Sequence, residues 1–386
     1  MASGLRQFGR YKLSILTTFR LGDALGNHLI EIANYASYNY VLNCAPGNIG
    51  VLELVLPRSF NTSLLMRDGR IGAWRSINGR PPYLDGNAIY LIETLRYTST
   101  ATLIRAYHAT TLLDRRIIAY AAGSTYCTKT AAPADDQIKA FMNENMLTGI
   151  VSADRDGVET QADVSSYLSK QANLSLGASV AKAAARRRLL NVARELAEAS
   201  TTAGTYLTFE IVAPTESTLE LRTYAVQRGV DRRASSGNPV ILREQSGVLE
   251  NAQLEIDWHN EKTFIVAGGQ GEGTQRLIAT ALDTTRMGVS PFGRIEDFAD
   301  MSNVADNTSL QDDADADLRY GRPSITFTGD LIETPALTRG IHFDFGDMMT
   351  AEDPQTNQQY DVRLDVVMEQ GDSNGRKSQI KLKSVT

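Results

Sequence analysis

The chain has 386 residues, of which 42% are hydrophobic, and its 39 basic and 45 acidic residues give a formal net charge of −6. This length exceeds what one hydrophobic core holds, so we expect about two to four domains. The hydrophobic fraction excludes a disordered chain. The mild acidity argues against a nucleic-acid-binding surface, because such a surface needs a basic face.

The cysteines and the lack of long apolar segments indicate the compartment in which the chain folds. Cys44 and Cys127 lie far apart and match no metal-ligand spacing, so we expect two thiols in a reducing compartment rather than a disulfide framework. Residues 1–20 lack the apolar core that a signal peptide needs. No apolar run is long enough to predict a membrane span. We therefore expect the chain to be made and folded in the cytoplasm.

The first third of the chain predicts β-structure. Apolar and polar residues alternate over residues 37–44 and again over 52–56, which is the period of a half-buried strand. Pro46 and Gly47 supply the turn between them, since proline presets φ and glycine accepts a positive φ. The two segments are expected to form a hairpin with one apolar face. Further strands are predicted around residues 71–74, 88–97 and 101–107.

Two helices are predicted in the middle of the chain. Pro133 opens the first, because proline is tolerated at the first helical position. The second is expected over residues 178–199, which are rich in the helix formers Ala, Leu, Arg and Glu. The run from Arg186 to Arg188 lies within it and is interpreted as a solvated face, with contact to a phosphate or an acidic partner as the alternative. The apolar stripe of this helix is Leu189, Val192, Leu196 and Ala199.

Strands follow the second helix. Residues 206–212 and 218–226 are expected to form two strands joined by a turn, and a polar linker covers residues 229–239. The alternation over residues 254–258 predicts another strand, from which the chain turns and returns as a strand over 263–267.

The last sixty residues predict a terminal hairpin. Its first strand should direct one set of side chains to the core, its loop covers residues 371–375, and Ile380 and Leu382 continue the apolar face on the second strand. The set that is expected to point one way on the first strand is Tyr360, Val362, Leu364, Val366 and Met368.

A glycine cluster from Gly268 to Gly273 invites a phosphate-binding interpretation, since it follows a predicted strand and precedes a helical pattern. Three features count against it. No Lys-Ser or Lys-Thr pair follows, Thr274 stands where the dinucleotide motif needs glycine, and Glu272 would repel a phosphate. We interpret the cluster as a tight strand-to-helix connection and expect no nucleotide binding.

An acidic cluster imitates part of a calcium loop. Asp313, Asp315 and Asp317 have the spacing of its first three ligands. Leu318 stands where such a loop needs glycine, and Ser324 stands where it needs glutamate. We therefore interpret the cluster as an exposed acidic stretch of helix or loop, and we expect no obligate calcium site.

Two further patterns fall short of a catalytic site. Residues 288–292 nearly form a nucleophile elbow, but Phe292 replaces the final glycine that the strained turn requires. The four histidines are scattered without metal-binding spacing. We therefore name no catalytic, cofactor-binding or metal-binding residue, and we expect no enzymatic activity and no cofactor. The histidines are His28, His108, His259 and His342.

The order of these features resembles the siphophage tail-hub family, whose members are also similar to the baseplate hub proteins of contractile tails. The resemblance runs along nearly the whole chain. No single motif is specific, but their order of appearance is. The segments that carry it are Tyr11 to Leu16, the turn from Asn43 to Gly47, the strand ending at Pro57, Arg70 to Arg75, Leu113 to Ile118, Pro133 to Met146, Gly229 to Arg232, Gly268 to Gly273, Arg294 to Phe298, and Phe345 to Thr350.

The resemblance implies a structural protein of the virion tail tip. It implies a homotrimeric ring that closes the distal end of the tail tube, adapts sixfold symmetry to threefold symmetry, and forms the channel for DNA and tape-measure release. The implied partners are a distal tail or tail-tube protein, the tape-measure protein, and spike, fibre or receptor-binding proteins. DNA is in contact only in transit, and no stable membrane binding is expected.

We predict an α+β, β-rich fold with two small tube-like β-barrel domains and a mixed α/β region inserted between them. The first β-rich domain is expected over residues 1–126, and the mixed domain over 127–239 with its remainder over 270–323. The second β-rich domain is expected to combine residues 240–269 and 324–386. Their alternation and length, rather than sequence identity, are what would make the two β-rich domains similar.

Three other functions stay open at this point. A tail-associated peptidoglycan hydrolase would need a positioned acid–base pair or a metal. A carbohydrate- or receptor-binding module would need clustered aromatic residues on loops, but the two tryptophans, Trp74 and Trp258, both lie in strand-like patterns. The hub of a phage-like injection particle would have the same sequence features as a tail hub.

Overall fold

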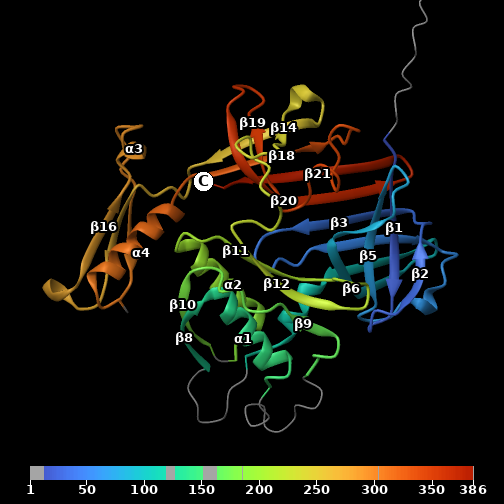
Figure 1. The fold of residues 1–386 in the computed structure, drawn as a ribbon, viewed down its shortest axis with the longest axis horizontal. Coiled ribbons are helices and arrows are strands. Elements are labelled where there is room, and N and C mark those ends of the chain that lie inside the picture. Colours follow the sequence, from blue (N-terminus) through green and yellow to red (C-terminus); the bar gives the residue numbers. More distant parts are fainter. Residues whose placement is uncertain (1–12, 119–126, 151–162, 185, 303, 386) are drawn as a thin grey trace, which may run out of the picture.

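The computed structural model describes residues 13–118, 127–150, 163–184, 186–302 and 304–385. Strands dominate and helices are few, which confirms the predicted α+β class. Figure 1 shows three parts: a large β-sheet, a middle domain with helices α1 and α2 below it, and a small module at the left that projects from the rest.

The large sheet contains thirteen strands from both ends of the described chain. They are β1 (Ile15–Gly22), β2 (His28–Ile32), β3 (Ser37–Asn43), β4 (Val51–Pro57), β5 (Arg70–Ile77), β6 (Tyr83–Tyr97), β7 (Ala101–His108), β13 (Ile241–Leu242), β14 (Leu249–Asp257), β18 (Ser324–Leu331), β19 (Met348–Glu352), β20 (Gln359–Asp372) and β21 (Gly375–Ser384).

The strand order joins the two predicted β-rich regions into one sheet. The path runs β14-β18-β21-β20-β3-β4-β7-β6-β5-β1-β2, and β19 pairs with both β13 and β20. The two regions meet where β20 pairs with β3 in antiparallel register, with Val367 opposite Leu42. Both residues are buried in one continuous core that also holds Phe19, Leu54 and Leu382. A single core thus stabilises both halves of the sheet.

The predicted strands of the first third are confirmed, with one adjustment. The hairpin predicted over residues 37–56 corresponds to β3 and β4, whose side chains alternate between buried and half-buried positions. The opening strand begins at Ile15. The predicted segment from Tyr11 to Leu16 therefore overlaps β1 only at its end, and residues 11–12 lie outside the described part of the chain.

The middle domain packs two helices against short strands. Its core also takes Leu113 and Ile118, which follow β7 and were predicted to belong to the first β-rich domain. The elements are the 3-10 helix η2 (Ala109–Arg115), β8 (Cys127–Pro133), α1 (Ala134–Met146), β9 (Leu168–Lys170), β10 (Ser179–Ala184), α2 (Leu189–Thr202), β11 (Leu207–Val212) and β12 (Leu219–Ala225). Shorter 3-10 turns elsewhere are η1 (Thr62–Leu64), η4 (Glu244–Ser246) and η5 (Gly273–Gln275).

The helix predicted over residues 178–199 is wrong in its first half. Residues 179–184 form β10, which pairs with β8, and α2 begins only at Leu189. Backbone pairing with a neighbouring strand here overrides the helix propensity of the alanines. Within α2 the residues of the predicted stripe are buried except for Ala199, which is exposed. Ser200 is buried on that side of the helix instead.

The arginine run lies at the start of α2 rather than inside a helix. Arg187 forms an ion pair with Glu195, and Arg188, at the position before the helix, lies 3.7 Å from an Asp114 carboxylate oxygen. Both side chains are about half exposed, so the interpretation as a solvated face fits them.

The projecting module, residues 263–322, has a sheet and a core of its own. Its elements are β15 (Phe264–Gly268), β16 (Ile278–Leu282), α3 (Thr284–Met287), β17 (Glu296–Asp300) and α4 (Asn307–Tyr320). The strand predicted over residues 263–267 exists as β15, but it pairs with β16 and β17 rather than with the second β-rich region. The module buries Ile265 and Leu310 in a core that is separate from that of the middle domain.

The terminal hairpin is confirmed as β20 and β21, with a correction to its alternation. The pairing register shifts between Leu364 and Val366. Beyond this shift Val367 and Glu369 are buried, whereas Val366 and Met368, which were predicted to face the core, are only half-buried. A one-residue shift moves every later side chain to the other face of a strand.

A cluster of buried charges lies between the two halves of the sheet. Arg339 is fully buried and donates two hydrogen bonds to Asp85 on β6, at 2.6 and 2.8 Å, and one to Glu369 on β20, at 2.8 Å. The Tyr40 hydroxyl donates to the same Asp85 carboxylate at 2.6 Å. Burial alone would raise the pKa of Asp85, but the charges of Arg339 and Arg75 hold it well below its usual value.

A second arginine pair completes this cluster. Arg75 on β5 is fully buried and lies 2.9 Å from Glu333, and Arg376 on β21 bridges Glu333 and Glu369. The cluster, which we call the buried ion network, therefore contains the three arginines at positions 75, 339 and 376 and the three carboxylates at positions 85, 333 and 369. Its formal charge is balanced, and its members come from both halves of the sheet.

We predict that Arg339→Met destabilises the fold by about 3–5 kcal/mol, because it leaves the Asp85 and Glu369 carboxylates buried without their partner. Urea unfolding followed by circular dichroism measures this loss. Arg105→Met is the matched control, since Arg105 pairs with Glu53 at the surface and should leave the free energy of unfolding nearly unchanged. An equal effect of both substitutions would contradict the prediction.

Candidate functional site

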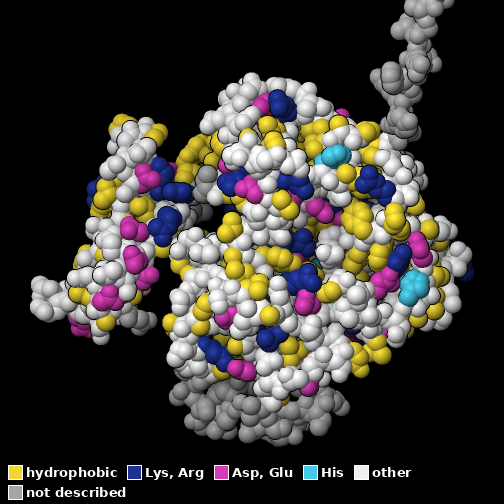
Figure 2. Space-filling view, viewed as in Figure 1, with side chains coloured by type: hydrophobic (Ala, Val, Ile, Leu, Met, Phe, Trp, Pro, Cys, Tyr) yellow, Lys and Arg dark blue, Asp and Glu magenta, His cyan; other side chains and the backbone are white. Residues whose placement is uncertain are grey.

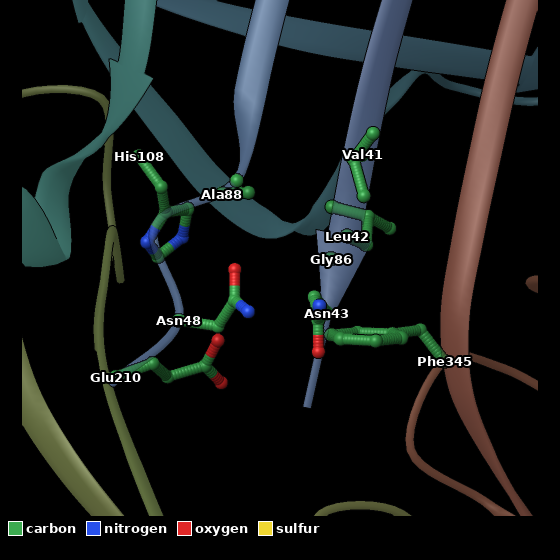
Figure 3. Close-up of a pocket in the computed structure, with 10 residues that line it drawn as sticks. Val41, Leu42, Asn43, Asn48, Gly86, Ala88, His108, Glu210 and Phe345 are labelled. Carbon is green, nitrogen blue, oxygen red and sulfur yellow. The ribbon is translucent and has the colours of Figure 1, made fainter. Parts of the chain in front are cut away.

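A small cavity lies where the sheet, the middle domain and the loop before β19 (residues 332–347) meet. Figure 3 shows Asn48, His108 and Glu210 on one side, and Leu42, Asn43 and Phe345 on the other. The cavity measures about 10 Å³, which is close to the space of one water molecule. A second cavity, beside Arg20 and Trp74, has the same volume. Neither cavity has room for a cofactor or an organic substrate.

The charged groups at this cavity hold the three parts together. Arg228, which follows β12, pairs with Glu210 and donates to the Gly86 carbonyl oxygen at 2.7 Å and the Phe345 carbonyl oxygen at 3.3 Å. Its guanidinium carbon also lies 4.6 Å from the centre of the Phe345 ring. One arginine therefore contacts β11, β6 and the loop before β19, and its chemistry here is structural.

His108 is neutral in this environment. Burial lowers its pKa to about 4. Its Nδ1 lies 3.0 Å from the Thr110 hydroxyl oxygen, which itself accepts a hydrogen bond from the Ile211 amide at 3.0 Å. The Thr110 backbone amide also donates to Nδ1, at 3.4 Å, so Nδ1 is an acceptor and the Thr110 hydroxyl donates its proton to it. The ring thus accepts at Nδ1 and links β7, η2 and β11.

The glycine cluster lies in a hairpin loop rather than at a helix start. The chain passes from β15 through η5 into the strand β16, so the predicted strand-to-helix connection is wrong. Arg276 donates to the carbonyl oxygens of Gly268 and Gly269, at 3.0 and 3.2 Å. Gly271 has a φ of 107°, which suits glycine. A phosphate-binding loop presents backbone amide groups to its ligand. This loop instead presents backbone carbonyl oxygens, and the Arg276 guanidinium occupies them.

The acidic cluster lies on helix α4, and its carboxylates diverge. Asp313 is exposed, Asp315 accepts a hydrogen bond from Gln311 at 3.3 Å, and Asp317 lies 3.5 Å from the Lys262 ammonium. Positions two apart on a helix point in nearly opposite directions. Within the described residues, no group of three or more His, Cys, Asp or Glu side chains could hold a metal ion.

The remaining sequence features lie apart from one another. Residues 288–292 form an exposed loop after α3, in which the Phe292 side chain is 88% exposed. The histidines lie in β2, at the end of β7, after β14 and before β19. Cys44 is buried, which raises its thiol pKa, and the Cys127 thiol lies 3.7 Å from Glu144. Trp258, predicted in a strand, follows β14 and is exposed. No described helix has the length and apolarity of a membrane span.

A family match decides the assignment. The profile of the family described as Siphovirus ReqiPepy6 Gp37-like protein matches residues 96–382, well over half of the chain. The chain belongs to this family. No curated protein matches the sequence. The match includes most of the middle domain, the projecting module and β14 to β20, so the siphovirus Gp37-like sequence pattern covers all three parts of the fold.

Solved structures show how widely the fold of this Gp37-like chain is shared. The tail protein from Neisseria meningitidis MC58 superposes with a TM-score of 0.58 at 14% identity, covering 96% of this chain and 97% of that chain. The 43 kDa tail protein of prophage MuSo2 from Shewanella oneidensis gives 0.58 at 10% identity, covering 96% and 98%. A chain of the Francisella PdpA–VgrG complex gives 0.53 at 11% identity, covering 98% and 54%. The family match thus confirms the predicted siphovirus family, and these structures show that the chain shares the fold of phage tail proteins.

The buried histidine predicts a pH dependence of stability. The folded pKa of His108 is about 4, below its ordinary value of 6.5, so the unfolded chain binds more protons between these pH values. The His108 contribution to stability should be complete above pH 6.5 and decrease by about 1.4 kcal/mol per pH unit as the pH falls towards 4. Urea unfolding at pH 7.5, 6 and 5 measures it.

His108→Asn provides the control for this pH dependence, because the amide oxygen can accept the Thr110 hydrogen bond but does not titrate. Its free energy of unfolding should decrease less steeply with falling pH than that of the wild type. Parallel pH profiles for the two proteins would contradict the assignment of a neutral His108.

Proposed function

We propose that this chain is the structural hub of a siphophage tail tip, which closes the distal end of the tail tube. In this proposal three copies form a ring around a channel, and the ring adapts a sixfold tube to a threefold tip. The channel releases DNA and the tape-measure protein on infection. The chain acts mechanically, without a catalytic residue, a cofactor or a metal.

The joining of two β-rich halves in one sheet is the observation that carries this proposal. Strands β1 to β7 make up one half, and β13, β14 and β18 to β21 make up the other, with the β3–β20 pair between them. If each half docks as one tube-like unit, three chains offer six such units to a sixfold tube. This arrangement solves the symmetry mismatch within a closed ring.

In this proposal the sheet faces the tail tube, so the middle domain and the projecting module lie on the distal side of the ring. In this proposal they hold the spike, fibre or receptor-binding proteins, while the sheet contacts the distal tail or tail-tube protein and the tape-measure protein. The shared fold with a chain of the PdpA–VgrG complex supports a place in a multi-protein assembly. The net charge of −6 suits a channel through which DNA passes without stable binding.

The oligomeric state tests the proposal. Native mass spectrometry of the purified chain should give a trimer, and electron microscopy of the trimer should show six similar β-rich units around one channel. A stable monomer, a hexamer of this chain, or two halves with unrelated arrangements in the ring would each contradict the proposal.

The absence of enzymatic activity is tested separately. Purified cell wall incubated with the chain should release no soluble fragments above the level of a heat-inactivated sample. Release that persists after repeated purification, and that disappears on substitution of a single carboxylate, would favour a tail-associated peptidoglycan hydrolase instead.

A further inference from the structure

The projecting module has one covered sheet face and one open sheet face. Ile265, Ala267 and Ala281 are buried on the covered face and pack against Leu310 and Ala314 of helix α4. Helix α4 in turn contacts α2 of the middle domain. The open face therefore points away from the middle domain of its own chain. Figure 1 shows the module as a separate arm beside the body.

The open face carries exposed apolar side chains on both of its edge strands, β16 and β17. The strand register places Leu282 beside Phe264, and Thr280 beside Val266 and Phe298. Phe298 is 52% exposed, Ile278 54% and Leu282 49%. Three strands of five residues cover on the order of 200 Å². That is about a quarter of the roughly 800 Å² that each partner contributes to an interface of standard size, so this face would form one part of a larger contact.

Two arginine–carboxylate ion pairs form the rim of this face, and each arginine also packs against an aromatic ring of the face. Arg276 pairs with Asp300 and lies over the Phe298 ring, and Arg294 pairs with Glu296 at the side of Phe264. The Arg294 guanidinium carbon lies 4.0 Å from the centre of the Phe264 ring. Because each rim charge already has its counter-charge on the same face, a partner needs apolar contact here rather than a strong opposite charge.

The distribution of charge along the chain favours one occupant. Residues 263–322 contain ten acidic and five basic residues, a net charge of −5, which leaves −1 of the chain's −6 for all other residues. Figure 2 shows several Asp and Glu side chains on the visible surface of the module. Two modules would therefore repel each other, whereas a module and the nearly neutral body of another copy would not. Contact between two different surfaces is the kind that closes rings.

We propose that the open face of the projecting module, which carries Phe298, Ile278 and Leu282, docks on the body of a second copy of this chain. Repeated around the threefold axis, this contact joins the copies of the ring. The inference rests on the proposed trimeric hub and names one surface that builds it.

Substitution on the open face tests this contact. Phe298→Asp places a charge among the exposed apolar side chains, and Phe292→Asp is the matched control, since Phe292 is an aromatic residue of the same module with 88% exposure in the loop after α3, outside the sheet. Light scattering over a dilution series measures the concentration at which the trimer dissociates. We expect Phe298→Asp to raise this concentration at least tenfold, and Phe292→Asp to leave it unchanged.

The outcomes separate the two proposals. A wild-type chain that is not a trimer contradicts the proposed function and this contact together. A wild-type trimer that Phe298→Asp leaves intact contradicts this contact alone. Circular dichroism and thermal melting establish that each variant is folded. If Phe298→Asp does not fold, Ile278→Ala and Leu282→Ala replace it. Each should raise the dissociation concentration several-fold, and no change in either would overturn the inference.

Discussion

The buried ion network is the interaction on which the arrangement of the sheet depends. Transfer of an ion from water into a protein interior costs on the order of several kcal/mol, and only close, hydrogen-bonded counter-charges offset this cost. Arg339 reaches Asp85 from the first half of the sheet and Glu369 from the second half. The two halves can therefore assemble in essentially one relative position, because any sliding of β20 along β3 would leave buried charges unpaired. We infer that the network stabilises this arrangement against alternatives more than it adds to overall stability.

The loop before β19, residues 332–347, contacts both the buried ion network and the middle domain, so it fixes the position of one relative to the other. It supplies Glu333 and Arg339 to the buried ion network, and Phe345 to the contact with Arg228. Asp347 of the same loop pairs with Arg232 at 2.9 Å and accepts from the Val230 amide at 2.6 Å. The sheet, the middle domain and the segment after β12 thus share one irregular segment. Irregular backbone suits this place, because its side chains must point in several directions that no strand or helix provides.

Local patterns predicted much of the secondary structure, and contacts between distant residues account for what they missed. Alternation located β3, β4 and the terminal hairpin, and the helix opened by Pro133 is α1, which buries Ile138 and Phe141. The Ala-rich residues 179–184 gave no local sign of the partner strand β8. The register shift after Leu364 was equally invisible, because a β-bulge depends on both strands. Glu369 alternates with the predicted apolar set of β20, so its burial in the buried ion network had no local signal either.

The candidate site could be predicted only in part for a related reason. In the structure the weak local motifs around Gly268, Ser290 and Asp313 all lie in the projecting module. The residues that organise the fold, such as Arg75, Arg339 and Arg228, belong to no motif, because their partners lie more than a hundred residues away or in another sheet. Long-range pairs of this kind leave no spacing in a single sequence.

The projecting module shows how solubility and assembly can be reconciled in one surface. An open apolar sheet face is an aggregation hazard in a free chain. Here the aromatic rings of that face are partly covered by Arg276 and Arg294, whose stems and guanidinium planes pack on them while the charges stay hydrated. The net charge of −5 on the module keeps two such faces apart. A surface with these properties remains soluble until it meets a neutral partner of matching shape. In the proposed ring each copy would meet this requirement, because it is synthesised alone and its open face is buried only on assembly.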